Sequence, residues 1–153
     1  MEEKRPEEAI PRLRMLRAAR PPRPDVAFNL VRAQLEAQHP DEANREAESD
    51  SKTFGNNADW SAAVGRAFEE NGRPREAGEY LAAALRARPD SPEIQQQLAG
   101  VRLELKDGAG AMAALQAGSN NGKDPERHYL LASSFCCCIA CPRLRPSRDR
   151  LSR

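Results

Sequence analysis

The sequence predicts an all-α fold, an α-solenoid of stacked helix-turn-helix repeats, and three observations support this class. The tetrapeptide Pro-x-Glu-Ala occurs at residues 6–9, 40–43 and 74–77, so its copies stand 34 residues apart. A fixed period of 20–50 residues is the signature of a stacked repeat architecture. Four apolar columns keep the same register, and apolar residues within each repeat follow helical spacing. An alanine-rich helical protein with accidental spacing is the alternative, and four columns in one register argue against it.

The columns consist of small or apolar residues that recur at the 34-residue period. They are Ala9, Ala43, Ala77 and Ala111; Leu13, Ala47, Leu81 and Leu115; Leu30, Val64 and Leu98; and Ala33, Ala67 and Val101.

The same register predicts seven helices and the start of an eighth near residue 126. The first carries Ile10, Leu13 and Leu16 and matches only the second helix of a repeat, so the array is expected to begin and end within a repeat. The expected helices cover residues 4–19, 24–37, 41–53, 58–71, 74–87, 92–105 and 109–118.

The clearest repeat covers residues 58–91. Asp59 is expected to cap its first helix, whose apolar residues from Trp60 to Phe68 follow i, i+3, i+4, i+7 spacing. Gly72 is expected to end that helix, because glycine tolerates the left-handed conformation of a helix stop. Pro74 opens the second helix, where its missing N–H costs nothing, and Pro89 prevents continuation.

This repeat resembles the tetratricopeptide repeat (TPR), whose 34-residue length and residue pattern it shares. The matching positions are Trp60 (within a residue), Val64-Gly65, Phe68, Gly72, Ala77, Leu81 and Pro89. The resemblance implies antiparallel helices stacked into a right-handed superhelix, with first helices lining a concave groove that holds a peptide or helix of a partner. We expect Gly65 and Ala77 to allow close approach of the two helices.

The neighbouring repeats match less well. Residues 24–57 place Val31 where the small glycine belongs and Asp50-Ser51 where the next repeat has Ala84-Leu85, so residues 44–57 are expected to be the least protected internal segment. In residues 92–125, Arg102 replaces the aromatic residue and Gly118 weakens the second helix. The predicted array covers residues 4–135: a partial repeat 4–23, repeats 24–57, 58–91 and 92–125, and a partial repeat 126–135.

A Cys/Arg-rich tail at residues 136–153 follows the array and is expected to be disordered. Cys138 and Cys141 form a CxxC pair, which raises a zinc or redox site as one interpretation. Zinc usually requires four ligands, and neither His39 nor His128 stands at a suitable spacing. A redox site requires a βαβ context that is missing. We therefore expect no metal and no cofactor; adventitious or lipid-modified thiols are the other alternative.

Composition and motifs narrow the function classes. The 24 basic and 23 acidic residues give a net charge of +1, so no global attraction to nucleic acid or membrane is expected. No apolar run suffices to span a bilayer and no signal peptide is visible, which makes a cytoplasmic location the default expectation. No phosphate-binding loop, nucleophile elbow or metalloprotease motif occurs, so the chain is not expected to be an enzyme.

The resemblance places a peptide-binding groove on first-helix residues that face away from the apolar columns. Arg32 and Arg66 stand one period apart, and two aligned arginines can hold a carboxylate. The alternative is that they are solvated charges paired with Glu36 or Glu69. No lysine accompanies Asn29 on this face, so a lysine–asparagine carboxylate clamp is not supported. The predicted contacts are Phe28, Arg32, Arg66, Glu69 and Gln96, and the wider face includes Asp25, Leu35, Asp59, Ala62, Glu70, Glu93, Gly100 and Leu103.

Two further hypotheses remain open. The chain could be a spacer fragment of a longer repeat protein, with no ligand of its own. Incomplete repeats at both ends would leave apolar faces uncovered, which favours end-to-end self-association. Mixed disulfides are expected at Cys136–Cys138 in oxidising buffer.

Overall fold

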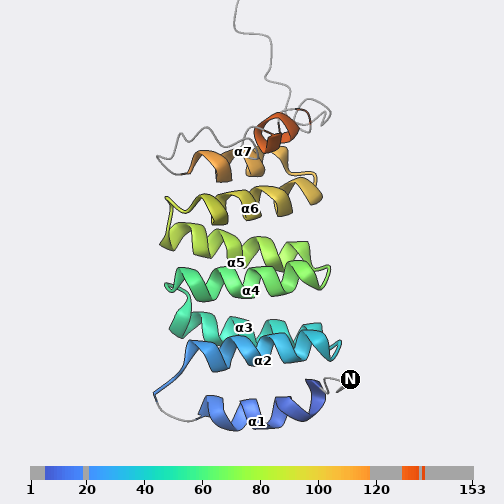
Figure 1. Cartoon of the computed structure of the whole chain (residues 1–153), viewed down its shortest axis with the longest axis vertical. Helices are drawn as coiled ribbons and strands as arrows, with labels where there is room; N and C mark the ends of the chain where they lie inside the picture. Colours follow the sequence, from blue (N-terminus) through green and yellow to red (C-terminus); the bar gives the residue numbers. More distant parts are fainter. Residues whose placement is uncertain (1–5, 19–20, 118–128, 135, 137–153) are drawn as a thin grey trace, which may run out of the picture. The chain divides into compact units, whose positions relative to one another are not determined.

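The computed structural model describes residues 6–18, 21–117, 129–134 and 136, and the regular structure within them is helical throughout (Figure 1). The all-α prediction is therefore confirmed, and each predicted helix boundary lies within two residues of the observed one. The helices are α1 (Pro6–Ala18), α2 (Pro24–Glu36), α3 (Pro40–Phe54), α4 (Ala58–Glu70), α5 (Pro74–Ala87), α6 (Pro92–Glu104) and α7 (Gly108–Gln116).

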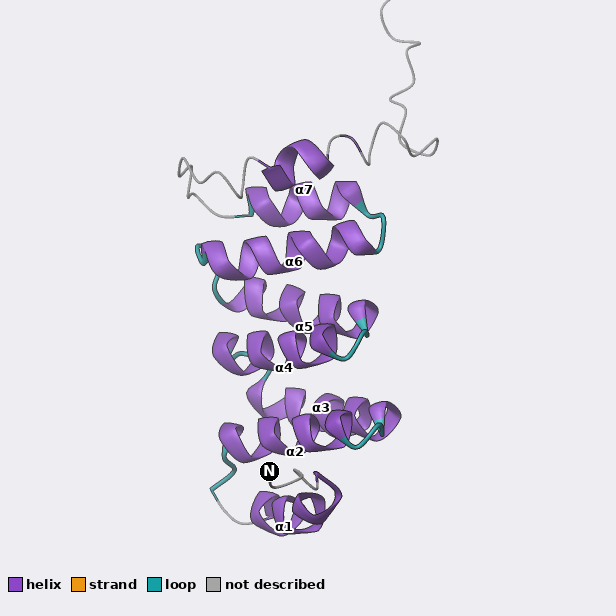
Figure 2. Ribbon diagram, turned by 45° about the vertical axis from the view of Figure 1, so that its right-hand side comes forward, coloured by secondary structure: helices purple, strands orange, loops and turns teal. Residues whose placement is uncertain are grey.

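The chain divides into two compact units, Met1–Arg88 and Pro89–Arg153. The first unit contains α1 to α5; α2 contacts α1, α3 and α4, and α4 packs along α5. Tight turns reverse the chain within each helix pair, as Figure 2 shows for α2–α3 and α4–α5. Helices α2 to α5 therefore bury apolar residues against neighbouring helices, which is how a repeat array replaces one thick core.

Proline starts most of the helices. Pro24, Pro40, Pro74 and Pro92 stand at the first turn of α2, α3, α5 and α6, where an N–H would have no intrahelical partner. Helix α4 begins differently, because the Asn57 side chain accepts hydrogen bonds from the backbone N–H groups of Asp59 and Trp60. The predicted cap at Asp59 is thus wrong by two residues: its carboxylate instead pairs with Arg88, whose Nη1 lies 2.8 Å from Asp59 Oδ1.

The turn within each complete repeat contains one residue in the left-handed conformation. Gly72 has a φ of 70°, which confirms the predicted helix stop. Gln38 and Lys106 stand one period before and after it and have φ values of 63° and 59°. Left-handed backbone costs a non-glycine residue free energy, and backbone hydrogen bonds within each turn offset that cost. The His39 N–H donates to the Gln34 carbonyl and the Asp107 N–H to the Arg102 carbonyl, both at 2.8 Å.

The α4–α5 pair has a close helix contact and an aromatic cluster. A Cβ added at Gly65 would lie 2.7 Å from Leu81 Cγ and 3.2 Å from the Ala77 carbonyl oxygen, so the predicted need for small residues here is confirmed. Phe68 stacks on Tyr80 with ring centroids 5.5 Å apart, and Trp60 meets Tyr80 edge-on at 6.4 Å. These offset and edge arrangements add to the burial of large rings.

The second unit pairs α6 with α7. Its buried residues include Leu98 and Val101 on α6 and Ala111 and Leu115 on α7. The Gln95 side chain is buried and donates to the Pro89 carbonyl at 2.6 Å. Residues 129–134 are helical, whereas the expected helix start near residue 126 falls outside the described residues.

Candidate functional site

Helix α2 presents Phe28 and Arg32 one turn apart, as the sequence predicts. The Arg32 guanidinium lies over the Phe28 ring, 5.8 Å from its centroid, in a cation–π arrangement. Arg32 Nε also lies 3.6 Å from Glu36 Oε1, and 53% of its side chain is exposed. The predicted pairing with Glu36 is therefore present, but its length and exposure make it a weak surface pair.

The remaining predicted contacts fall on two different helices. Arg66 is exposed on α4 and has no ion-pair or hydrogen-bond partner in the described part of the chain. Glu69 is half-buried on the same helix. Because α2 and α4 are in contact, Phe28, Arg32, Arg66 and Glu69 belong to one packed layer. Gln96 lies on α6, which belongs to the second unit.

Two residues assigned to the open face are buried instead. Leu35 is 2% exposed and Ala62 is 6% exposed, so neither is available to a ligand. Leu35 is near the end of α2 and its side chain joins the packed interior, although its spacing from Phe28 and Arg32 suggested the solvent side. In the first unit, the apolar part of the predicted face consequently reduces to Phe28; Leu103, in the second unit, is half-buried.

An open pocket of about 600 Å³ lies between α1 and α2, beside this face. From α2 it takes the half-buried Asn29, together with Arg32, Ala33 and Glu36. From α1 it takes Pro6, Glu8, Ala9, Arg12 and Leu13. The pocket floor is continuous with a small apolar cluster of Ile10, Leu30 and Ala33 that joins the two helices. Arg32 thus borders both the predicted peptide face and the pocket.

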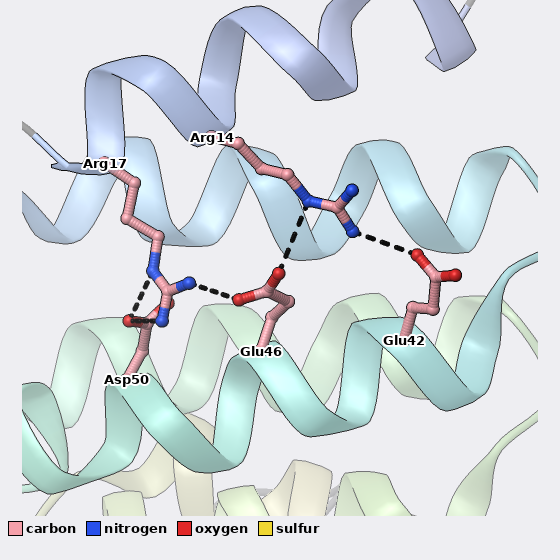
Figure 3. Close-up of polar contacts among 5 residues, drawn as sticks. All are labelled: Arg14, Arg17, Glu42, Glu46 and Asp50. Carbon is pink, nitrogen blue, oxygen red and sulfur yellow. Dashed lines mark hydrogen bonds and ion pairs between the residues drawn. The ribbon is translucent and has the colours of Figure 1, made fainter.

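A network of ion pairs, which sequence reasoning missed, connects α1 to α3 (Figure 3). Arg14 Nη2 lies 3.0 Å from Glu42 Oε2, and Arg17 Nε donates to Asp50 Oδ1 at 2.9 Å. Both arginines also pair with Glu46. The signal was present in the sequence: Glu42, Glu46 and Asp50 repeat every four residues on one helix face, and Arg14 and Arg17 share a face of another.

Asp50 is the buried end of this network. Burial raises the pKa of the Asp50 carboxyl group, while the hydrogen bond and charge of Arg17 oppose that rise. Its Oδ2 atom has no hydrogen-bond partner among the described residues. The Asp50 side chain is nevertheless buried, and Arg17 holds its carboxylate.

The structure describes one residue of the Cys/Arg-rich tail, Cys136. Cys136 is exposed and has a free thiol. Cys137, Cys138 and Cys141 lie outside the described residues, so the predictions of a disordered tail, mixed disulfides and no metal site there remain predictions.

Comparison with known proteins agrees with the fold. The sequence model of the tetratricopeptide repeat family matches residues 1–67 and 69–133. A solved structure of a mutant of MamA is similar with a TM-score of 0.56 at 17% identity, over 86% of this chain and 77% of that one. No curated protein gives a significant sequence match. Among the helices described, none is long and apolar enough to cross a membrane. With most of its length covered by the family's own model, the chain belongs to the tetratricopeptide repeat family.

Proposed function

We propose that this chain binds an acidic peptide segment of a partner protein on the face formed by Phe28, Arg32 and Arg66. Tetratricopeptide repeats serve in general as scaffolds for protein interaction, and the family is generally not enzymatic. The proposal gives that general role a location on this chain and a charge preference.

The observation that supports the proposal best is the state of the two arginines. Arg66 is exposed and makes no charged contact with any described residue, and Arg32 makes only the 3.6 Å pair with Glu36. A guanidinium binds a carboxylate through two parallel N–H donors, so each arginine could hold one acidic side chain or a chain terminus. The Phe28 ring orients Arg32, which reduces the conformational entropy lost on binding.

The test begins with a displayed library of twelve-residue peptides selected against the full chain. The best acidic sequence is synthesised, and its affinity is measured by fluorescence anisotropy. Replacing both arginines (Arg32→Glu and Arg66→Glu) should weaken binding at least about tenfold, equivalent to ~1.4 kcal/mol. The matched control is Arg45→Glu with Arg75→Glu, two exposed arginines on the second helices α3 and α5.

The outcomes separate the two hypotheses. Loss of affinity only in the Arg32/Arg66 variant, with an unchanged far-UV circular dichroism spectrum, would support the face. Equal affinities for both variants would show that the site has been misplaced. A selection that enriches no acidic peptide would favour the spacer hypothesis. Glu69 and Gln96 stay predicted contacts, and single alanine substitutions in the same assay test each of them.

A further inference from the structure

Comparison with the α4–α5 pair indicates that the pocket between α1 and α2 is a groove that could hold an α-helix. The register makes α1 a second helix of a repeat, because Ala9 and Leu13 belong to the columns of Ala77 and Leu81. In α5, Ala77 and Leu81 are fully buried and lie against Gly65 of the first helix α4. In α1, Ala9 and Leu13 are only half-buried and line the open pocket.

Two more α1 residues can be compared with the residues at the same register positions of α5. Leu16 stands in the column of Ala84; Leu16 is 57% exposed, whereas Ala84 is fully buried. Arg12 stands in the column of Tyr80, whose ring contacts Trp60 and Phe68 of α4. The open α1 residues Ala9, Arg12 and Leu13 are thus the counterparts of α5 residues that contact α4.

Helix α2 supplies the second wall of the groove. Asn29, Arg32, Ala33 and Glu36 line the pocket, and their counterparts one period later on α4 are Ala63, Arg66, Ala67 and Glu70. Helix α4 is itself in contact with α2, so consecutive first helices pack together in this unit. A helix placed in the pocket would therefore contact α1 as α4 contacts α5, and it would contact α2 as α2 contacts α4. The molecule already makes both kinds of contact.

We propose that the groove between α1 and α2 binds an amphipathic α-helix of a partner protein, in the relation that α4 has to α5. The bound helix should carry a large apolar residue followed by glycine or alanine, as in Val64-Gly65, to fit closely over Ala9 and Leu13. It should also be acidic or aromatic opposite Arg12, which is exposed and has no ion pair among the residues described. This mode is helix-in-groove docking and differs from the peptide face of the proposed function, although Arg32 borders both.

The probe is a synthetic peptide with the sequence of residues 57–71, amidated at its C-terminus and labelled with fluorescein at its N-terminal amine. It contains Asp59, Glu69 and Glu70 against Arg66, and so carries a net charge of −2. Anisotropy is measured against the full chain. A second peptide with Gly65→Leu provides the test of fit, since a side chain at that position meets Leu81 in the pair that serves as template.

Two chain variants locate the binding. Ala9→Arg fills the groove, and Met15→Arg adds the same side chain on α1 at a residue that is 77% exposed and does not line the pocket. Ala9→Arg and the Gly65→Leu peptide should each weaken binding at least about tenfold, and Met15→Arg should leave it unchanged. Circular dichroism spectra check that both variants fold alike.

Three outcomes would overturn the proposal. These are no binding at millimolar peptide, equal affinity of the two peptides, or equal affinity of the two chain variants; the last would mean that the peptide invades elsewhere. Concentration-dependent dimerisation that Ala9→Arg abolishes in sedimentation equilibrium would instead assign the groove to a second copy. Arg66→Glu in the chain tests the acidic-peptide face and leaves this groove intact, so the two proposals fail independently.

Discussion

The α2–α3 and α4–α5 pairs share one register, one turn geometry and one unit, yet their interiors are filled differently. Where α4 has Phe68, stacked on Tyr80, α2 has Gln34, which is equally buried. Both polar atoms of the Gln34 side chain lack a hydrogen-bond partner in the part of the chain that the structure describes. Where α5 has the buried Ala84, α3 has the buried Asp50. The backbone plan therefore tolerates a polar interior at the same positions, at a cost in free energy.

This difference shows that a neighbouring helix can offset a poor interior. Buried polar groups without partners are expensive, and a buried charge more so. Arg17 of α1 offsets part of the cost by holding the Asp50 carboxylate. Helix α1 therefore contributes more to the α2–α3 pair than its single buried residue, Ile10, suggests. The α4–α5 pair instead contains an aromatic cluster of Trp60, Phe68 and Tyr80, to which Phe54 of α3 adds a ring contact with Trp60.

Substitutions at the register position that Phe68 and Gln34 share should give the largest change in the free energy of unfolding. Phe68→Gln removes a stacked ring and buries an unpaired amide, so it should destabilise the chain by about 3–5 kcal/mol. At the matching position of α2, replacing the buried amide with an apolar side chain of similar size (Gln34→Leu) should stabilise the chain by about 1–2 kcal/mol. Urea denaturation monitored by circular dichroism measures both. A destabilising Gln34→Leu would mean that a water or an unrecognised partner satisfies the Gln34 amide.

Hydrogen exchange compares the two pairs without mutation. The backbone amide of Ala47 in α3 and that of Leu81 in α5 occupy the same register position, and both side chains are fully buried. We expect the Ala47 amide to exchange about a hundredfold faster, equivalent to ~2.7 kcal/mol of opening free energy. Residues 58–91 should be the best protected and residues 44–57 the least protected internal segment, so exchange should be slower in 74–87 than in 44–57. Equal exchange rates at the two amides would contradict the prediction that α3 is less protected than α5.

Overpacking tests the close approach of α4 and α5. Ala77→Leu adds three carbons where the Ala77 backbone and Leu81 already lie against Gly65, and it should cost about 1–3 kcal/mol. The control is Ala82→Leu, which is half-buried on the same helix and should change the free energy of unfolding by less than about 0.5 kcal/mol. If both variants keep wild-type stability, the helix pair is looser than its geometry indicates.

The smallest expected effect is the pH dependence at Asp50. Burial raises the pKa of Asp50 above its ordinary value of 3.8, with Arg17, Glu46 and Tyr80 as its charged and titratable neighbours. For an acid with a raised folded-state pKa, the associated stabilisation is present at low pH and is lost as pH rises through that pKa. Asp50→Ala, which installs the residue of the next repeat, should therefore gain stability relative to wild type between pH 4 and 7, by less than about 1 kcal/mol.

The control for that experiment is Ser49→Ala, at the exposed position next to Asp50 on the same helix. It introduces the same helix-favouring alanine but removes no titrating group. Its stability difference from wild type should therefore not vary with pH. A difference for Asp50→Ala that shrinks as pH rises would show that the Arg17 ion pair outweighs burial.

The helices and turns were within reach of the sequence because their causes are local. Proline at helix starts, glycine at Gly72 and the small pair Gly65 and Ala77 act through backbone geometry and nearest-neighbour packing. A repeat contacts only adjacent repeats, so a 34-residue register already states which helix faces meet. This is why Phe28 and Arg32 were correctly placed together on one turn of α2.

Other features required the tertiary structure. Arg17 and Asp50 are 33 residues apart and reach each other from α1 to α3, past the intervening helix in the chain. The burial of Leu35 and the left-handed turns at Gln38 and Lys106 run against what local spacing and propensity suggest. The open groove between α1 and α2 is likewise a property of two helices together. The sequence by itself determined the period, the helices and their contact faces; only the tertiary structure decided which polar groups are buried and which apolar faces stay open, because both depend on the sum of neighbours in space.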